Sequence, residues 1–326
     1  MILITGATGF LGKTLVEELY KQGYDIRVLV RPSSDIAFLD KFDKIQIAVG
    51  DVRDLVSVDK AVAGCDIVIH AAAHFRFWGE KHLFKKTNVQ GTHHVCQSAL
   101  HHDVKRVLYI STIAVMGAPS SDMVITESSL PKPVDPYQCS KLRAEKIVQT
   151  YHKQHGMDTI ILRLGALYGL HGRYALNRLF FEEFLRGWRV KLDGGKYITF
   201  PCFVKDAAHG IESAMRLGKS GEMYNISGES VSHNEFNLLV SRLSNKSTWR
   251  LNFPKIIMLN FARFLEGLAT ITQREPFYPI NLQYYVFHNW MVDSQKARDT
   301  LGFQSTPLEE GVMQTLAWYK SELGLY

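Results

Sequence analysis

Three glycines near the start of the chain, in Thr5-Gly-Ala-Thr-Gly-Phe-Leu-Gly12, limit what this sequence can fold into. They follow a short apolar run at residues 1–4, which predicts a buried strand, and precede residues 13–21, whose apolar positions recur at helical spacing. Glycines at such a turn let the backbone approach a pyrophosphate, and the helix N-terminus offers free N–H groups to the anion. The sequence therefore predicts a dinucleotide-phosphate loop. Its candidate binding residues are Gly6, Thr8, Gly9, Phe10, Leu11 and Gly12.

Beyond this loop, predicted strands and helices alternate along the first half of the chain. We expect strands at 25–30, 45–49, 66–69, 104–110 and 158–162, and helices at 81–101 and 136–155. Such alternation predicts an α/β fold of Rossmann type with a doubly wound parallel sheet. We expect the dinucleotide-binding domain to span residues 1–164. A smaller, mainly substrate-binding lobe at 165–326 is expected to be interleaved with it.

Composition argues against several other classes of protein. The chain has 326 residues, 46% of them hydrophobic, but no apolar run approaches the ~20 residues of a membrane span. With no charged leader before the first strand, we expect a cytoplasmic protein without an integral membrane segment. The four cysteines form no C-x-x-C pair and the thirteen histidines show no ligand spacing, so no metal site is predicted. The net charge of +6 is dispersed, which argues against nucleic acid as a partner.

Two polar segments fall where a doubly wound sheet binds its ligands, after the carboxyl ends of strands. Ser111-Thr112 closes the strand expected at 104–110. Tyr137 and Lys141 stand four residues apart on the helix expected at 136–155, so both side chains lie on one helix face. Asp135 and Pro136 supply an N-cap and a first-turn proline for this helix.

These residue types fit the chemistry of hydride transfer. A hydride leaves an alcohol carbon only as the hydroxyl proton is removed, and a phenol is a poor base unless a neighbouring cation stabilises the phenolate. We expect Lys141 to supply that cation, Tyr137 to exchange the proton, and Thr112 to hydrogen-bond the substrate oxygen.

At this point the chain resembles a known family, the extended short-chain dehydrogenases, also called the NAD-dependent epimerase/dehydratase family. The resemblance covers nearly the whole length. It rests on the glycine loop, Gly50-Asp51-Val52, His70-Ala-Ala-Ala73, Asn88-Val-Gln-Gly-Thr92, Ser111-Thr112 with Ile-Ala-Val-Met-Gly117, Tyr137 to Lys141, Arg163 to Gly169, and Val204-Lys-Asp206.

The resemblance implies a role for several further residues. Asp51 and Val52 are expected to flank the adenine, and Asn88 to lie at the back of the site. The bridge of the cofactor is expected to lie against Ala71, Ala72 and Ala73. Thr112, counted back from the Val-Met-Gly turn, takes the catalytic hydroxyl position rather than Ser111. Helices 81–101 and 136–155 are those through which the family commonly dimerises, so a homodimer is expected.

The end of the second strand indicates which cofactor is bound. Folds that select NAD usually place an acid there for the ribose hydroxyls, whereas this chain has Val30-Arg31-Pro32. A guanidinium suits bidentate phosphate binding, so Arg31 favours the 2′-phosphate of NADP, with NAD as the alternative.

The substrate side is less constrained. Nucleotide-sugar enzymes of the family carry an arginine five residues before the valine of Val204-Lys-Asp206, and here that position is Thr199. Arg173 could replace it as an anchor, or could order its own loop. Residues 253–290 hold many aromatic side chains, which suits either an apolar substrate pocket or ordinary core packing. They include Phe261, Phe264, Phe277, Tyr278, Tyr284, Tyr285 and Phe287.

Three functions remain open at this stage. The segments after Trp290 resemble the 3β-hydroxysteroid dehydrogenase branch, and Val-Arg-Pro-Ser resembles the dihydroflavonol reductase-like branch. Both imply an NAD(P)-dependent oxidoreductase that interconverts a secondary alcohol and a ketone on a fairly apolar small molecule. The alternatives are a nucleotide-sugar epimerase or dehydratase with tightly bound NAD, and a dinucleotide-binding sensor without catalysis.

Overall fold

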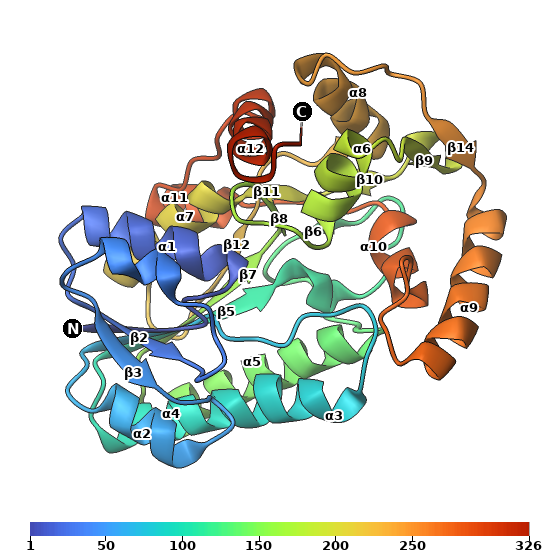
Figure 1. Cartoon of the computed structure of the whole chain (residues 1–326). Helices are drawn as coiled ribbons and strands as arrows, with labels where there is room; N and C mark the ends of the chain where they lie inside the picture. Colours follow the sequence, from blue (N-terminus) through green and yellow to red (C-terminus); the bar gives the residue numbers. More distant parts are fainter. Residues whose placement is uncertain (326) are drawn as a thin grey trace.

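A seven-stranded parallel sheet forms the centre of the molecule (Figure 1). A computed structural model describes residues 1–325, and all neighbouring strands of this sheet run parallel, in the order β12-β7-β5-β4-β1-β2-β3. The fold is therefore the predicted Rossmann-type α/β fold. The strands are β1 (Ile2–Thr5), β2 (Ile26–Val30), β3 (Gln46–Val49), β4 (Ile67–His70), β5 (Arg106–Thr112), β7 (Thr159–Leu164) and β12 (Met223–Ile226).

Helices cover both faces of the sheet, as its near-continuous apolar strands require. One layer holds α2, α4 and α5, and the other holds α1, α7 and α11 (Figure 1). Their bounds are α1 (Phe10–Lys21), α2 (Leu55–Val62), α4 (Gly91–His101), α5 (Pro136–His155), α7 (Val204–Leu217) and α11 (Gln295–Leu301). Since β12, α7 and α11 come from beyond residue 164, the second half of the chain completes the sheet domain as well as building the lobe.

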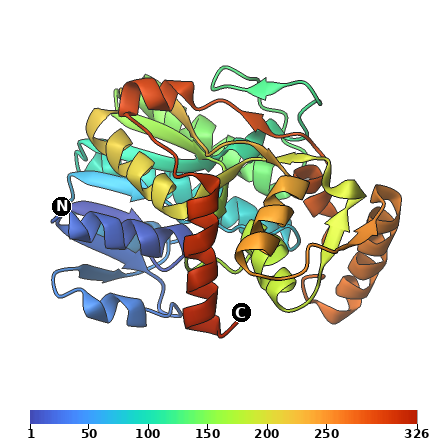
Figure 2. The ribbon, with the colours of Figure 1, turned by 90° about the horizontal axis from the view of Figure 1, so that it is seen from above.

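The lobe consists of short strand pairs and helices next to the carboxyl ends of the sheet strands. Seen from above, α12 runs between the sheet domain and the orange helices of the lobe (Figure 2). The strands of the lobe are β8 (Ala166–Tyr168), β9 (Val190–Leu192), β10 (Ile198–Thr199), β11 (Pro201–Phe203), β13 (Val231–Ser232), β14 (Leu251–Phe253) and β15 (Met291–Val292). The last of these pairs with β6 (Val124–Ile125). Its helices are α6 (Glu183–Leu185), α8 (His233–Leu243), α9 (Lys255–Thr272), α10 (Gln283–Val286) and α12 (Leu308–Leu323).

Several predicted bounds need correction. The helix expected at 81–101 is helical throughout, but α3 (Lys81–Phe84) and α4 are joined by a π-helical segment, Lys85–Gln90. The strand expected at 104–110 runs from Arg106 to Thr112 instead, because the amide of Val104 still bonds back to the carbonyl of Ala99 at the end of α4. Ser111 and Thr112 are therefore the last two strand residues.

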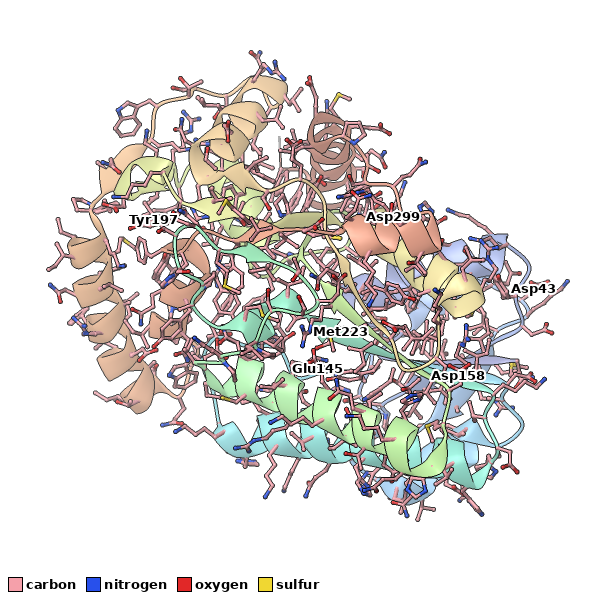
Figure 3. All side chains as sticks on the ribbon, turned by 180° about the vertical axis from the view of Figure 1, so that it is seen from behind. Asp43, Glu145, Asp158, Tyr197, Met223 and Asp299 are labelled. Carbon is pink, nitrogen blue, oxygen red and sulfur yellow. The ribbon has the colours of Figure 1, made fainter. Side chains whose placement is uncertain are left out.

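A buried ion pair fixes α5 against the sheet. Glu145 on α5, labelled in Figure 3, accepts hydrogen bonds from Arg163 on β7 at 2.9 and 2.7 Å and from the hydroxyl of Ser111 on β5 at 2.6 Å. The side chains of Arg163 and Glu145 are 3% and 1% exposed. A carboxylate with three donors in a solvent-free position links three elements at one point.

We predict that Glu145→Leu lowers the free energy of unfolding by about 3–5 kcal/mol, because it leaves the Arg163 charge buried without a partner. Chemical denaturation measures the change. Glu309→Leu is the matched control, since it removes an exposed ion pair with Arg242 and should change stability little. Equal effects of the two substitutions would contradict the structural role given to Glu145.

Candidate active site

The glycine loop connects β1 to α1 under tight steric limits. Gly6 has φ +77°, and a Cβ there would lie 2.7 Å from the amide nitrogen of Ala72. A Cβ on Gly12 would lie 2.1 Å from the carbonyl oxygen of Gly6. Gly9 is the N-cap of α1 and has no side chain to bond the first-turn N–H groups. The loop thus forms a cradle of bare backbone at a helix N-terminus, which fits the pyrophosphate of a dinucleotide.

A cavity of ≈ 380 Å³ extends from this loop into the lobe. It passes the carboxyl ends of β5 and β7, and then reaches side chains from the lobe. The predicted site residues that line it are Gly6, Gly9, Phe10, Leu11, Gly12, Ala71, Ala73, Thr112, Tyr137 and Lys141. The structure therefore brings the phosphate loop and the three proposed catalytic side chains to one cavity.

Tyr137 and Lys141 lie on the face of α5 that packs against the end of β5. The ammonium of Lys141 donates a 2.6 Å hydrogen bond to the carbonyl of Ile110, and it lies 4.3 Å from the ring centroid of Tyr109. Burial lowers the pKa of Lys141 to about 7. Its contacts are thus with β5, and stabilisation of a Tyr137 phenolate by Lys141 stays a prediction.

The phenol of Tyr137 faces the cavity between Thr112 and Phe75. Its hydroxyl interacts with the side chain of Thr112, and its ring centroid lies 4.6 Å from that of Phe75. Burial and the nearby Asp135 carboxylate raise the pKa of Tyr137, while the neighbouring Thr112 side chain acts to lower it. The phenol is therefore protonated at neutral pH, which is the form that gives a proton to a developing alkoxide, but the raised pKa makes it a weaker acid than a free phenol.

The two hydroxyls at the end of β5 have different partners. Ser111 donates to Glu145 inside the protein, whereas Thr112 accepts from the Ala114 amide and lines the cavity with Tyr137. This geometry is consistent with the choice of Thr112 over Ser111 as the hydroxyl that meets the substrate.

The residues predicted for the adenosine end lie outside the cavity lining. Asp51 forms an ion pair with Arg53 at 2.7 Å, and although burial raises the pKa of Asp51, the hydrogen bonds from Arg53 outweigh it and lower that pKa. The charge of the exposed Arg31 also acts on Asp51, so the two arginines share one region. Val52 is buried, with its carbonyl 2.9 Å from Nδ1 of His94. Thr8 likewise stands outside the lining.

Asn88 and Ala72 act on the backbone around the site. The side-chain oxygen of Asn88 accepts from the amide of His74 at 2.7 Å, and its nitrogen donates to the His74 carbonyl and to Ser140 Oγ. The π-helical segment holds Asn88 in position to join the loop after β4 to α5. Ala72 packs against Gly6, and its amide donates to Thr5 Oγ1 at 3.2 Å. Both are positioning residues in this arrangement.

His70 and Tyr285 have roles at the site that the sequence did not indicate, because only tertiary contacts bring their partners to them. His70 bridges Thr5 at 2.7 Å and Thr92 at 3.1 Å, and burial lowers its pKa to about 3, so its imidazole is neutral. Tyr285 lines the cavity and donates to Asp135 at 2.8 Å. Only the aromatic content of residues 253–290 pointed towards Tyr285.

The far end of the cavity has a largely apolar wall, and within residues 1–325 both arginines of the lining are paired with acids. Of the two arginines in its lining, Arg76 pairs with Glu275 at 3.6 Å and Arg173 with Glu182 at 2.7 Å, which favours a loop-ordering role for Arg173. Burial lowers the pKa of His233 to about 4. The apolar wall consists of Phe75, Phe77, Leu176, Leu179, Phe180, Leu282 and Val286.

Three of the aromatic residues expected in a pocket or core lie elsewhere. Phe261, Phe264 and Phe277 are exposed, whereas Tyr278 and Phe287 are buried. From the sequence we expect these residues either in a substrate pocket or in the core, and both expectations are wrong for these three phenylalanines. They belong to the outer side of α9 and the segment after it.

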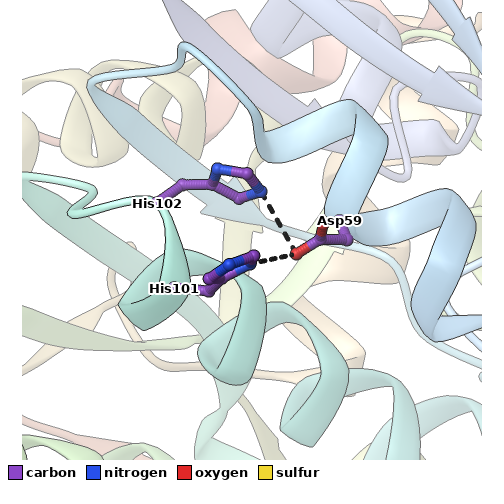
Figure 4. Close-up of side chains that lie close together, drawn as sticks. All are labelled: Asp59, His101 and His102. Carbon is purple, nitrogen blue, oxygen red and sulfur yellow. Dashed lines mark hydrogen bonds and ion pairs between the residues drawn. The ribbon is translucent and has the colours of Figure 1, made fainter.

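A separate cluster of titratable side chains lies on the surface between α2 and α4 (Figure 4). His101 Nδ1 and His102 Nε2 lie 3.0 and 3.1 Å from the same carboxylate oxygen of Asp59. Hydrogen bonding to His101 is the main cause that lowers the pKa of Asp59. These side chains lie on the surface, outside the cavity lining.

Comparison with known proteins defines the class. The model of the NAD dependent epimerase/dehydratase family matches residues 2–227. The chain belongs to this family, and it is an NAD(P)-dependent enzyme of the extended short-chain dehydrogenase type. Within residues 1–325, no helix has the length and apolar character needed to cross a bilayer.

Individual relatives carry different activities. The chain is 30% identical over 224 residues to a 4-hydroxy-2-methyl-3-oxo-4-farnesyl-3,4-dihydroquinoline-1-oxide ketoreductase of Stigmatella aurantiaca, covering 68% of this chain and 66% of that protein. It is 27% identical to a dTDP-glucose 4,6-dehydratase of Streptomyces antibioticus, covering 98% and 92%. The crystal structure of gox2253 superposes with a TM-score of 0.84 at 26% identity, covering 98% of each chain.

Proposed function

We propose that this protein interconverts a secondary alcohol and a ketone on a fairly apolar small molecule, of steroid, flavonoid or related type. The observation that carries the proposal is the cavity itself, with Thr112 and Tyr137 at one end and an apolar wall at the other. NADP, with NAD as the alternative, supplies or accepts the hydride when bound. Tyr137 gives a proton to the ketone oxygen, and Thr112 holds that oxygen where negative charge develops.

The charges around the cavity favour this reaction over chemistry on a nucleotide sugar. Its lining within residues 1–325 includes no aspartate or glutamate, so no carboxylate stands ready to act as a second acid or base for eliminating water. Thr199 lines the cavity where the nucleotide-sugar enzymes would have an arginine for a diphosphate. The ketoreductase relative, whose name specifies a farnesylated substrate, gives further support.

A nucleotide-sugar epimerase or dehydratase is the second candidate, because the dehydratase relative aligns with 98% of this chain. Such an enzyme keeps its NAD and regenerates it in each cycle. Denaturing the purified protein and finding one released NAD per chain would favour this candidate over the first.

We predict that Tyr137→Phe lowers kcat by about 10²–10⁴-fold for NADPH-dependent reduction of a panel of steroid, flavonoid and simple ketones, because the proton donor is lost. Loss of NADPH absorbance measures the rate. Tyr151→Phe, on the same helix, is the matched control and should retain the activity. Inactivity of the unmodified protein across the panel would count against the proposal.

Arg31 gives the cofactor prediction. We expect Arg31→Ala to weaken NADPH binding by about tenfold or more, because charge-assisted hydrogen bonds to the 2′-phosphate are lost. NADH, which lacks this phosphate, serves as the internal control and should bind nearly as before. Calorimetric titration of both nucleotides measures this, and unchanged NADPH affinity would reject the assignment.

We also propose a homodimer through the outer sides of α4 and α5, and a cytoplasmic location. The layer formed by α2, α4 and α5 lies away from the lobe (Figure 1), so pairing there would leave the cavity accessible. We expect analytical ultracentrifugation to give about twice the chain mass of 37.1 kDa, and a species of 37.1 kDa alone would refute the dimer.

A further inference from the structure

Helix α9 has one apolar side inside the protein and a second one in solvent. Met258 and Ala262 are buried in the cluster that also holds Leu282 and Val286 of the cavity wall, and Ala269 is buried further along the helix. The outer apolar face is a set of exposed side chains, of which Phe264 is 63% and Ile271 80% exposed. This outer face consists of Ile256, Ile257, Phe261, Phe264, Leu268 and Ile271.

Most of the outer apolar face forms one stripe along the helix. From Ile257 to Ile271 its members recur at alternating intervals of four and three residues, which places them on one side of an α-helix. Figure 1 shows α9 at the edge of the molecule, far from the sheet. Leaving such a stripe in water is unfavourable by about 25 cal/mol per Å² of apolar surface. Extended exposed patches of this kind mark sites of interaction.

Aromatic residues concentrate in the same region. Across residues 1–325, every exposed tryptophan and phenylalanine lies at position 188 or between 249 and 277. Trp249 precedes β14, which leads through Pro254 into α9, and the ring of Trp188 lies 6.2 Å from that of Phe277. Tryptophan and phenylalanine are the side chains that interfacial helices insert at the boundary of a bilayer.

Two segments around α9 carry more basic than acidic residues, so the net charge is less evenly dispersed than expected from the sequence. Segments 186–196 and 246–274 contain nine lysines and arginines but only two acids, Asp193 and Glu266. The rest of the chain has 29 basic and 30 acidic residues, and so no net positive charge. Arg263 on α9 and Arg274 just beyond it are both exposed, while Arg250 is buried against Phe184.

We propose that the outer apolar face of α9 docks on an anionic lipid bilayer, with the helix lying in the plane of the membrane surface. The apolar stripe would enter the headgroup boundary, and the surrounding lysines and arginines would meet anionic headgroups. The basic charge favours this partner over a second copy of the chain, because two copies meeting through this face would bring like charges together. The inference goes beyond the proposed function, since docking requires no turnover.

Docking would place the cavity close to the membrane. The inner side of α9 packs on the cluster that supplies Leu282 and Val286 to the cavity wall, so α9 and the segment 280–286 would separate the bilayer from the apolar end of the cavity. An apolar substrate dissolved in lipid would thus reach the protein on the side where its pocket is apolar.

Co-sedimentation with vesicles tests the proposal on the full-length protein. We expect binding to vesicles of phosphatidylcholine and phosphatidylglycerol in equal parts, weaker binding to phosphatidylcholine alone, and weakening by high salt. The double variant Phe261→Ser/Phe264→Ser should bind the anionic vesicles at least about tenfold more weakly, because two inserted rings are lost. Leu130→Ser is the matched control, since Leu130 is 77% exposed but lies outside this face.

Two results would overturn the proposal. One is equal sedimentation of the unmodified protein with and without anionic vesicles. The other is self-association through α9, detected by ultracentrifugation as assembly that the double variant loses while Leu130→Ser retains it. Thermal unfolding of each variant checks that it is folded. If the unmodified protein does not reduce ketones, that result contradicts the proposed function and leaves the membrane proposal to the vesicle experiment.

Discussion

The contact between one face of α5 and the last three residues of β5 holds the site together. Tyr137, Lys141 and Glu145 follow one another at intervals of four, so they share that face. Each meets a different one of these β5 residues: Glu145 accepts from the Ser111 hydroxyl, Lys141 donates to the Ile110 carbonyl, and Tyr137 lies beside the Thr112 side chain. Since Arg163 ties the same carboxylate to β7, a shift of α5 would break all of these contacts together.

Local sequence pattern was sufficient for much of the fold, and its failures have physical causes. The bounds of α5 are those expected, because Asp135 accepts from the Gln138 amide at its start and Gly156 ends it in a left-handed conformation. The π-helical turn at Lys85–Gln90 escaped prediction, since its residues are also compatible with an α-helix. Its cause is tertiary: Asn88 is held by the backbone of His74 and by Ser140.

The same limit applies to the candidate site. Motifs local in sequence placed the glycine loop, Thr112, Tyr137 and Lys141, and the structure brings these to one cavity. The partners of His70 and Tyr285 lie 22 to 150 residues away in the chain, so no local pattern indicates them. Nor could sequence distinguish an aromatic side chain that faces the core from one that faces water, which is why Phe261 and Phe264 were expected inside.

Helix α9 carries apolar side chains that face the core and others that face water, and the second set bears on function. Its apolar residues cover more of its circumference than the cavity-side cluster can bury, and the excess is gathered on one side rather than scattered. If α9 served only to pack behind the cavity wall, Phe264 and Ile271 in water would add nothing to the stability of the protein. Exposed apolar side chains of this kind also increase the risk of aggregation. The proposed bilayer would supply a second apolar neighbour for this outer face, and the basic residues around the face favour a bilayer with anionic headgroups. The helix that packs behind the cavity wall would then also fix the orientation of the protein at the membrane surface.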